Sequence, residues 1–170
     1  MQYLFLDLRN TYHSLKKVYG QRVDLNKLKE NINPDHVVIC ANYFKKANPF
    51  YTHAIKLGYV IEAPPSRYRV NEVQQRNSEV TMSLICKILE VLSDDFSVAH
   101  DFYIGSNDPN LYAFIKWLKS LDVGHKVILL TPTCDEDLLS IVDEWVRLDE
   151  EYLLSVKEEE HLGVSSHSSS

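Results

Sequence analysis

Short apolar runs alternate with longer amphipathic segments along most of the chain. The apolar runs have the composition of buried strands, and there are five: residues 2–8, 36–43, 59–63, 101–105 and 126–130. The segments between and after them space their apolar residues as amphipathic helices do: residues 24–33, 45–57, 78–92, 109–121 and 135–153. This alternation predicts a single three-layer α/β domain with a parallel, about five-stranded sheet covered by helices on both faces.

The boundaries of these segments carry recognisable signals. Asp24 stands at the start of residues 24–33, where a carboxylate can cap the first helical N–H groups. Gly58 follows residues 45–57, and glycine commonly terminates a helix. The polar segment 66–77 lacks periodicity and is predicted to be a loop.

Composition supports one globular domain. The chain has 170 residues, of which 45% are hydrophobic and 25% charged, values that exclude a disordered chain or a fibrous repeat. We expect the domain to span residues 1–153. The remainder, 154–170, is acidic and rich in Ser and His, and we expect it to be disordered.

The sequence also indicates a cytoplasmic protein without membrane contact. No apolar run approaches the ~20 residues that span a bilayer, and the first residues lack the basic stretch of a secretory signal. Cys40, Cys86 and Cys134 lie too far apart for a structural zinc site and fit a reducing compartment. Cys40 and Cys86 lie in apolar segments and are predicted to be buried.

Charge and motifs narrow the function further. The net charge of −6 argues against a surface coated with basic residues, but it permits a local basic patch beside an acidic site. The chain contains no GxGxxG, GxxxxGK[ST] or GxSxG sequence, so dinucleotide-binding, P-loop and serine-hydrolase functions have no support.

Polar residues follow two of the predicted strands. Asp7 ends the first strand and Asn10 comes three residues later, whereas Ser106, Asp108 and Asn110 follow the strand of residues 101–105. Ligands of open parallel sheets bind outside the carboxyl ends of the strands. We therefore expect these side chains to gather at one edge of the sheet.

Glu79 is the third acid that we expect at this edge, because it lies in the first turn of the helix of residues 78–92. Carboxylates of Asp7, Glu79 and Asp108 would together suit Mg²⁺ or Mn²⁺, which prefer oxygen ligands. A metal held in this way neutralises a phosphate and lowers the pKa of a bound water. The acids therefore predict phosphoryl-transfer chemistry.

Each acid also has a purely structural interpretation. Asp7 can cap a loop, and Asn10 can form an Asx turn. Glu79 can complement a helix dipole, and Asp108 can be an N-cap ahead of Pro109. It is their joint placement at one edge of the sheet that favours a functional site.

At these residues the sequence resembles the NYN domain, a branch of the PIN-like nuclease superfamily, and the resemblance runs through about residues 2–150. Residues 4–10 (LFLDLRN) resemble the opening strand of the family, an apolar run followed by Asp-Gly-x-Asn. Asp7 and Asn10 keep the spacing of that motif, and Leu8 replaces its glycine.

Three later segments carry the rest of the resemblance. Residues 76–80 (RNSEV) are similar to the family's Lys-Gly-x-Asp segment, with Glu79 in place of Asp. Residues 106–111 (SNDPNL) are similar to its Ser-Gly-Asp-x-Asp-Phe loop, with Asn110 in place of the second acid. Residues 138–148 resemble its closing helix.

The resemblance implies a PIN-like, Rossmann-like fold and a metal-dependent nuclease that acts on RNA more than on DNA. It assigns the catalytic and metal-binding roles to Asp7, Glu79 and Asp108, with Asn10, Ser106 and Asn110 in support. Two alternatives stay open. The Asn110 departure fits a catalytically weakened, nucleic-acid-binding or regulatory module. An Asp at the end of the first strand also fits a phosphatase on a doubly wound sheet, although residue 9 is Arg, so the usual Asp-x-Asp is absent.

A nuclease also needs cations near its acids. We expect phosphate contacts and base stacking from basic and aromatic residues on either side of the predicted site: Arg67, Tyr68, Arg69, Arg76, Lys16 and Lys17. The sequence leaves both a monomer and a homo-oligomer open.

Overall fold

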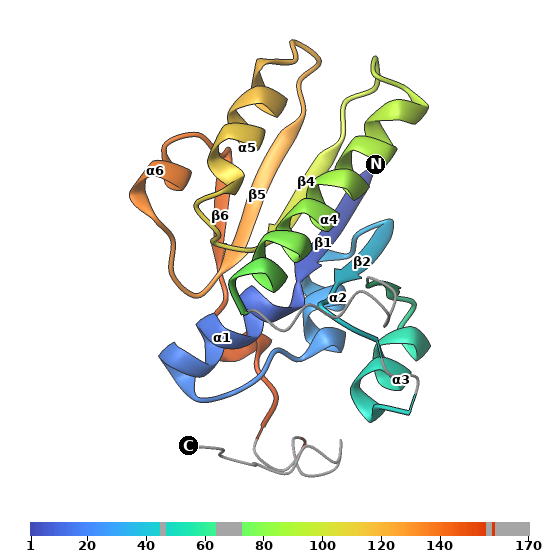
Figure 1. Ribbon diagram of the computed structural model, residues 1–170, viewed down its shortest axis with the longest axis vertical. Helices are drawn as coiled ribbons and strands as arrows, with labels where there is room; N and C mark the ends of the chain where they lie inside the picture. Colours follow the sequence, from blue (N-terminus) through green and yellow to red (C-terminus); the bar gives the residue numbers. More distant parts are fainter. Residues whose placement is uncertain (45–46, 64–72, 156–157, 159–170) are drawn as a thin grey trace.

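The computed structural model describes residues 1–44, 47–63, 73–155 and 158, with the backbone alone for residues 73–78. Its centre is a six-stranded, all-parallel sheet in the order β3-β2-β1-β4-β5-β6 (Figure 1). The strands are β1 (Gln2–Asp7), β2 (His36–Cys40), β3 (Val60–Glu62), β4 (Asp101–Gly105), β5 (Lys126–Thr131) and β6 (Glu144–Arg147). The predicted α/β class and parallel sheet are confirmed, with one strand more than expected.

Helices connect successive strands. The α-helices are α1 (Leu8–Tyr19), α2 (Leu25–Ile32), α3 (Pro49–Lys56), α4 (Val73–Asp94), α5 (Leu111–Ser120) and α6 (Glu136–Leu139). A short 3₁₀ helix, η2 (Glu150–Tyr152), follows β6. The cap predicted at Asp24 is confirmed, because its carboxylate accepts hydrogen bonds from the backbone N–H groups of Asn26 and Lys27 at 2.9 and 3.1 Å.

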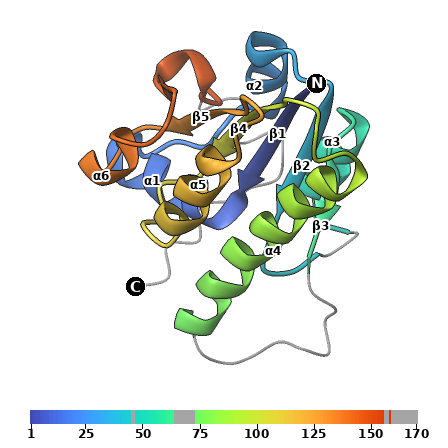
Figure 2. The same ribbon diagram turned by 90° about the horizontal axis from the view of Figure 1, so that it is seen from above.

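Two apolar clusters on opposite faces of the sheet make this a three-layer domain. On one face Leu4 and Leu6 of β1 pack with side chains of α1, α2 and α3. On the other face Phe5 packs with side chains of α4, α5 and α6. Figure 2 shows α4 and α5 on one side of the sheet and α2 and α3 on the other. The alternation of residues 4, 5 and 6 between the clusters is the period of two expected of a strand buried on both faces.

The structure differs from the predicted elements in three places. Residues 8–19 form α1, which the sequence pattern did not bring out. The α4 helix begins at Val73, inside the segment predicted to be a loop. The single helix predicted over residues 135–153 is wrong: α6 ends at Leu139 and β6 follows. The closing helix implied for residues 138–148 by the family resemblance is therefore mostly strand and connection here.

The end of the domain and one cysteine also differ from expectation. Leu154 is buried, and its N–H donates to the Arg22 carbonyl at 2.9 Å, so the fold continues past residue 153. Of residues 154–170, for which the sequence predicts disorder, residues 156–157 and 159–170 lie outside the described residues. Cys40 is buried as predicted, whereas the prediction for Cys86 is wrong, because this thiol is exposed on α4. Within the described ranges, none of the helices has both the length and the apolar character to cross a bilayer.

The strand order creates a crevice between β1 and β4. These neighbours have a parallel register from Gln2 opposite Asp101 to Leu6 opposite Gly105. The chain leaves β1 into α1 on one face and leaves β4 toward α5 on the other. This divergence is the topological switch point at which open α/β sheets bind ligands.

A candidate acidic site at the switch point

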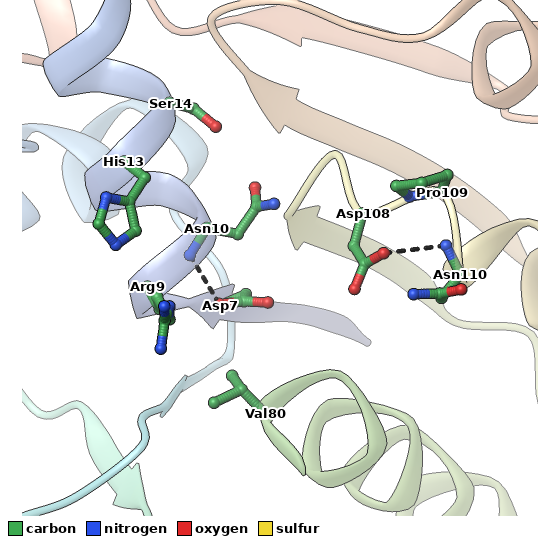
Figure 3. Close-up of a pocket in the computed structure, with 9 residues that line it drawn as sticks. All are labelled: Asp7, Arg9, Asn10, His13, Ser14, Val80, Asp108, Pro109 and Asn110. Atoms are coloured by element: carbon green, nitrogen blue, oxygen red, sulfur yellow. Dashed lines mark hydrogen bonds between the residues drawn. The ribbon is translucent and has the colours of Figure 1, made fainter. Parts of the chain in front are cut away.

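A pocket of about 530 Å³ opens at this switch point. Three parts of the chain line it: the start of α1, the second turn of α4 and the loop between β4 and α5 (Figure 3). The lining residues are Asp7, Arg9, Asn10, His13, Ser14, Val80, Asp108, Pro109 and Asn110.

Asp7 is the most deeply buried acid of the pocket. It is the last residue of β1 and also the N-cap of α1, and its Oδ1 accepts a hydrogen bond from the Asn10 N–H at 2.9 Å. Only 3% of its surface is exposed. The sequence allowed Asp7 to cap a loop, whereas here it caps the helix α1, and it also lines the pocket. An ionised carboxylate has about four acceptor sites, so this cap hydrogen bond does not exhaust its capacity.

Burial raises the pKa of the Asp7 carboxyl to about 6. The charge of Asp108 contributes to this rise in the pKa, while hydrogen bonding by the backbone of Asn10 and Arg9 and by the Ser106 side chain opposes it. Asp7 is thus mostly ionised at neutral pH, at the cost of a buried charge. No ion pair with Asp7 forms among the described residues, so a cation in the pocket would relieve this cost.

Asp108 lies on the other side of the pocket, where hydrogen bonds hold its carboxylate. The Thr81 hydroxyl donates to Oδ2 at 2.5 Å, and the Asn110 N–H donates to Oδ1 at 2.9 Å. The Asp108 N–H donates in turn to the buried Ser106 hydroxyl oxygen at 3.2 Å. The sequence also allowed Asp108 to be a helix N-cap. The α5 helix begins at Leu111, however, with Asn110 at its N-cap position, and Asp108 lies in the preceding loop.

Thr81 is a site residue that the sequence analysis missed. It is buried on α4, three residues before Leu84 and seven before Ile88, which are both core residues. A polar side chain on the buried stripe of a helix is the signal that was available, because such a group needs a hydrogen-bond partner. Here that partner is the Asp108 carboxylate.

Hydrogen bonds join the two sides of the switch point. The Asn107 N–H donates to Asn10 Oδ1 at 3.0 Å, and the Thr11 hydroxyl donates to the Gly105 carbonyl at 3.0 Å. A Cβ atom on Gly105 would lie 2.5 Å from Leu6 Cδ1, so any other residue here would require the buried Leu6 side chain to move. The start of α1 and the loop after β4 therefore form one connected unit.

The structure does not bring Glu79 into the pocket. Its side chain is exposed, and the neighbouring Val80 lines the pocket instead. Among the residues that the structure describes, no three His, Cys, Asp or Glu side chains are grouped so as to hold a metal ion. What the structure assembles is a pair of carboxylates, Asp7 and Asp108, which approach from opposite sides of the pocket (Figure 3).

Among the described side chains, the basic residues near the acids differ from those that the sequence singled out. Arg9 and His13 line the pocket, whereas Lys16 and Lys17 lie in the last turn of α1, and Lys16 Nζ donates to the Gly20 carbonyl at 2.9 Å. Of the other predicted contacts, residues 67–69 lie outside the described part of the chain. Arg76 belongs to α4, and only its backbone is described.

Two carboxylates are a sufficient protein contribution for one kind of metal site. Mg²⁺ keeps several waters and is often bound through one or two carboxylates together with a substrate phosphate. Asp7 and Asp108 supply hard oxygen donors, and the burial of Asp7 without a cationic partner among the described residues gives such an ion an electrostatic reason to bind. The residues present therefore fit a hydrated Mg²⁺ or Mn²⁺.

Comparison with known proteins supports the fold. No protein-family model matches the chain, and no curated protein matches it. A solved structure of a protein of unknown function from Vibrio parahaemolyticus superposes on it with a TM-score of 0.71. The two sequences are 16% identical, and the match covers 90% of this chain and 95% of the other. The architecture thus recurs across nearly the full length of another protein.

Proposed function

We propose that the protein is a divalent-metal-dependent nuclease that hydrolyses phosphodiester bonds, with RNA favoured over DNA by the resemblance to NYN domains. The observation that carries the proposal is the pair formed by Asp7 and Asp108 on opposite sides of one pocket at the switch point. The pocket volume of about 530 Å³ lies within the usual range of small-ligand sites and has room for a nucleotide-sized group.

In this proposal Asp7 and Asp108 hold Mg²⁺ or Mn²⁺, which, when bound, activates a water and neutralises the charge of the phosphodiester. The other residues keep the two carboxylates in position. The Ser106 hydroxyl oxygen accepts a hydrogen bond from the Asp108 N–H, and the Ser106 side chain lowers the pKa of Asp7. Thr81 orients Asp108, and Asn10 fixes the loop that carries it. Hydrogen-bonded supports of this kind are as important to metal sites as the ligands themselves.

The test is incubation of the purified protein with end-labelled single-stranded RNA and DNA in Mg²⁺, in Mn²⁺ and in chelator. We expect cleavage of RNA with either metal and none in chelator. The Asp108→Asn variant should be inactive, and the Glu136→Gln variant serves as a control, because Glu136 lies in the first turn of α6 and is not part of the pocket lining. Cleavage that survives in Asp108→Asn would contradict the proposal, because contaminating nucleases are unaffected by this substitution.

A second candidate is a nucleic-acid-binding or regulatory module that does not cleave. Two observations favour it. Glu79 lies outside the pocket, and the lining residue Asn110 occupies a position at which the NYN family, which this chain resembles, has an acid. The same assay separates the candidates, since a binding module retains RNA without producing fragments in any metal.

We also propose the cytoplasm as the working compartment. Cys40, Cys86 and Cys134 are all free thiols, and Cys86 is exposed on α4. Exposed free thiols are typical of reducing compartments. Labelling of Cys86 by a thiol reagent in freshly lysed cells, without prior reduction, would agree with this assignment.

A further inference from the structure

One wall of the pocket carries positive and hydrogen-bond-donating side chains that the metal proposal does not use. Arg9 and His13 are four residues apart on α1, so their side chains project from the same face of the helix. Both line the pocket with the two acids (Figure 3). They lie on the α1 side, whereas Asp108 and Asn110 lie on the opposite side.

The charge of Arg9 has no carboxylate partner in the part of the chain that the structure describes. Within the described ranges, none of the ion pairs involves Arg9, although Asp7 is only two residues away. Other cations of the chain do have carboxylate partners: Lys27 pairs with Asp24, Lys87 with Glu62 and Glu90, and Lys119 with Asp143. A guanidinium fork that faces a pocket without a carboxylate partner among the described residues is suited to an anion that arrives from solution.

The charges of the lining indicate which anion. Two carboxylates and one guanidinium leave the pocket with one formal negative charge, which repels anions when no cation is bound. With a divalent cation between the carboxylates the sum becomes one positive charge. That balance matches the single negative charge of a phosphodiester, and Arg9 and His13 provide the N–H donors that its non-bridging oxygens accept.

We propose that Arg9 and His13 form the phosphate-binding wall of the site. They hold one phosphate of a nucleic-acid strand against α1 while the acids of the pocket hold the cation. The proposal rests on the proposed function for its substrate class. It assigns the main phosphate contact to the first two turns of α1, instead of Lys16 and Lys17 at its far end.

The test is equilibrium binding of a short fluorescein-labelled single-stranded RNA to the full chain, with Ca²⁺ in place of Mg²⁺, measured by anisotropy over a range of salt concentrations. Arg9→Gln should weaken binding by roughly tenfold or more, the loss expected for a charge-assisted hydrogen bond. It should also lower the slope of log affinity against log salt by roughly 0.7, the value for one phosphate on a single strand. His13→Asn should weaken binding to a smaller extent.

Lys17→Gln is the matched control, because it removes the same charge from an exposed position in the last turn of the same helix. The RNA affinity of Lys17→Gln should stay within about twofold of the wild type, and its salt slope within about 0.2. Arg9→Lys should keep most of the slope while losing affinity, because lysine retains the charge without the fork.

The outcomes separate this inference from the proposed function. Weaker binding in Arg9→Gln, with Lys17→Gln unchanged, supports the phosphate wall even if the wild type cleaves nothing. Cleavage by the wild type together with unchanged affinity and slope in Arg9→Gln overturns the wall and leaves the nuclease proposal standing. Equal losses in Arg9→Gln and Lys17→Gln would also overturn it, because they indicate a diffuse electrostatic contact.

Discussion

The Asn10 amide oxygen accepts a hydrogen bond from the Asn107 backbone N–H at 3.0 Å, across 97 positions of sequence. Asn10 itself belongs to the first turn of α1, which Asp7 caps, and Asn107 immediately precedes Asp108. This bond therefore fixes the distance between the two elements that carry the acids of the pocket. It replaces the local Asx turn that the sequence allowed for Asn10.

Loss of this bond should loosen the site. We expect Asn10→Ala to destabilise the fold by about 1 kcal/mol, the typical net value of a hydrogen bond, and to reduce RNA cleavage at least severalfold. Asn26→Ala is the control, because the partner of its side chain among the described residues is the exposed Glu30 on the same helix. Urea unfolding and the cleavage assay measure the two effects. Equal behaviour of the two variants would contradict a bridging role for Asn10.

Asp7→Asn should separate stability from activity. The folded-state pKa of Asp7, about 6, lies above its ordinary value of 3.8, so ionisation of this carboxyl destabilises the fold as pH rises from about 4 through 6. The full difference corresponds to roughly 3 kcal/mol. Asparagine is an equally good N-cap and carries no charge. The variant should therefore be inactive, yet more stable than the wild type above pH 6 in the absence of metal.

The pH dependence of the stability gained by Asp7→Asn distinguishes a buried charge from a purely structural cap. Denaturant midpoints of both proteins at pH 4 and pH 8 should show little difference at pH 4 and a clear gain for Asp7→Asn at pH 8. A variant that is less stable than the wild type at both pH values would mean that the carboxylate serves only as a structural cap.

Thr81 should act through Asp108. Its hydroxyl donates to the Asp108 carboxylate at 2.5 Å from a buried position on α4. Thr81→Val keeps the shape and removes the donor, and supports of this kind are typically worth 10- to 100-fold in metal affinity or activity. We expect a Mn²⁺ affinity reduced by that order and substantial recovery in Thr81→Ser, which restores the hydroxyl. Equal affinities of the Val and Ser variants would count against the positioning role.

Gly105→Ala should crowd the buried Leu6 side chain. The added Cβ would lie 2.5 Å from Leu6 Cδ1 in the core, and overpacking of this kind costs about 1–3 kcal/mol. In a Leu6→Ala background the space is already open, so the glycine substitution should cost much less there. A double-mutant cycle by urea unfolding measures this coupling. Additive costs would show that the cost of Gly105→Ala does not arise from crowding of Leu6.

The sequence predicted the fold class and the central strands because their signals are local. The apolar run of β1 and the cap at Asp24 can be read from a few adjacent residues. In contrast, β6 is a short edge strand whose only strand partner is β5, through a register such as Leu129 opposite Trp145. Its apolar residues continue the helical spacing of α6, and nothing within residues 135–153 specifies that pairing.

The site was predictable as far as strand ends determine it. Asp7 and Asp108 follow directly from the carboxyl edge of a parallel sheet. The position of Glu79 could not be predicted in this way. Neighbouring residues of a helix point in different directions, so whether Glu79 or Val80 faces the pocket depends on how α4 is rotated, and this helix begins five residues earlier than predicted. Arg9 and His13 could have been placed at the site only if α1 had been predicted. The signals for this helix were its N-cap at Asp7 and the terminal Gly20.

The most direct test of the two-carboxylate metal site is a titration of the metal-free protein with Mn²⁺ at pH 7.5, in which binding is measured by isothermal calorimetry or electron paramagnetic resonance. The account predicts one bound ion per chain in the wild type, loss of that ion in Asp7→Asn and in Asp108→Asn, and wild-type binding in Glu79→Gln. Binding of Mn²⁺ by Asp7→Asn and Asp108→Asn as tightly as by the wild type would contradict the central claim that these two carboxylates hold the metal.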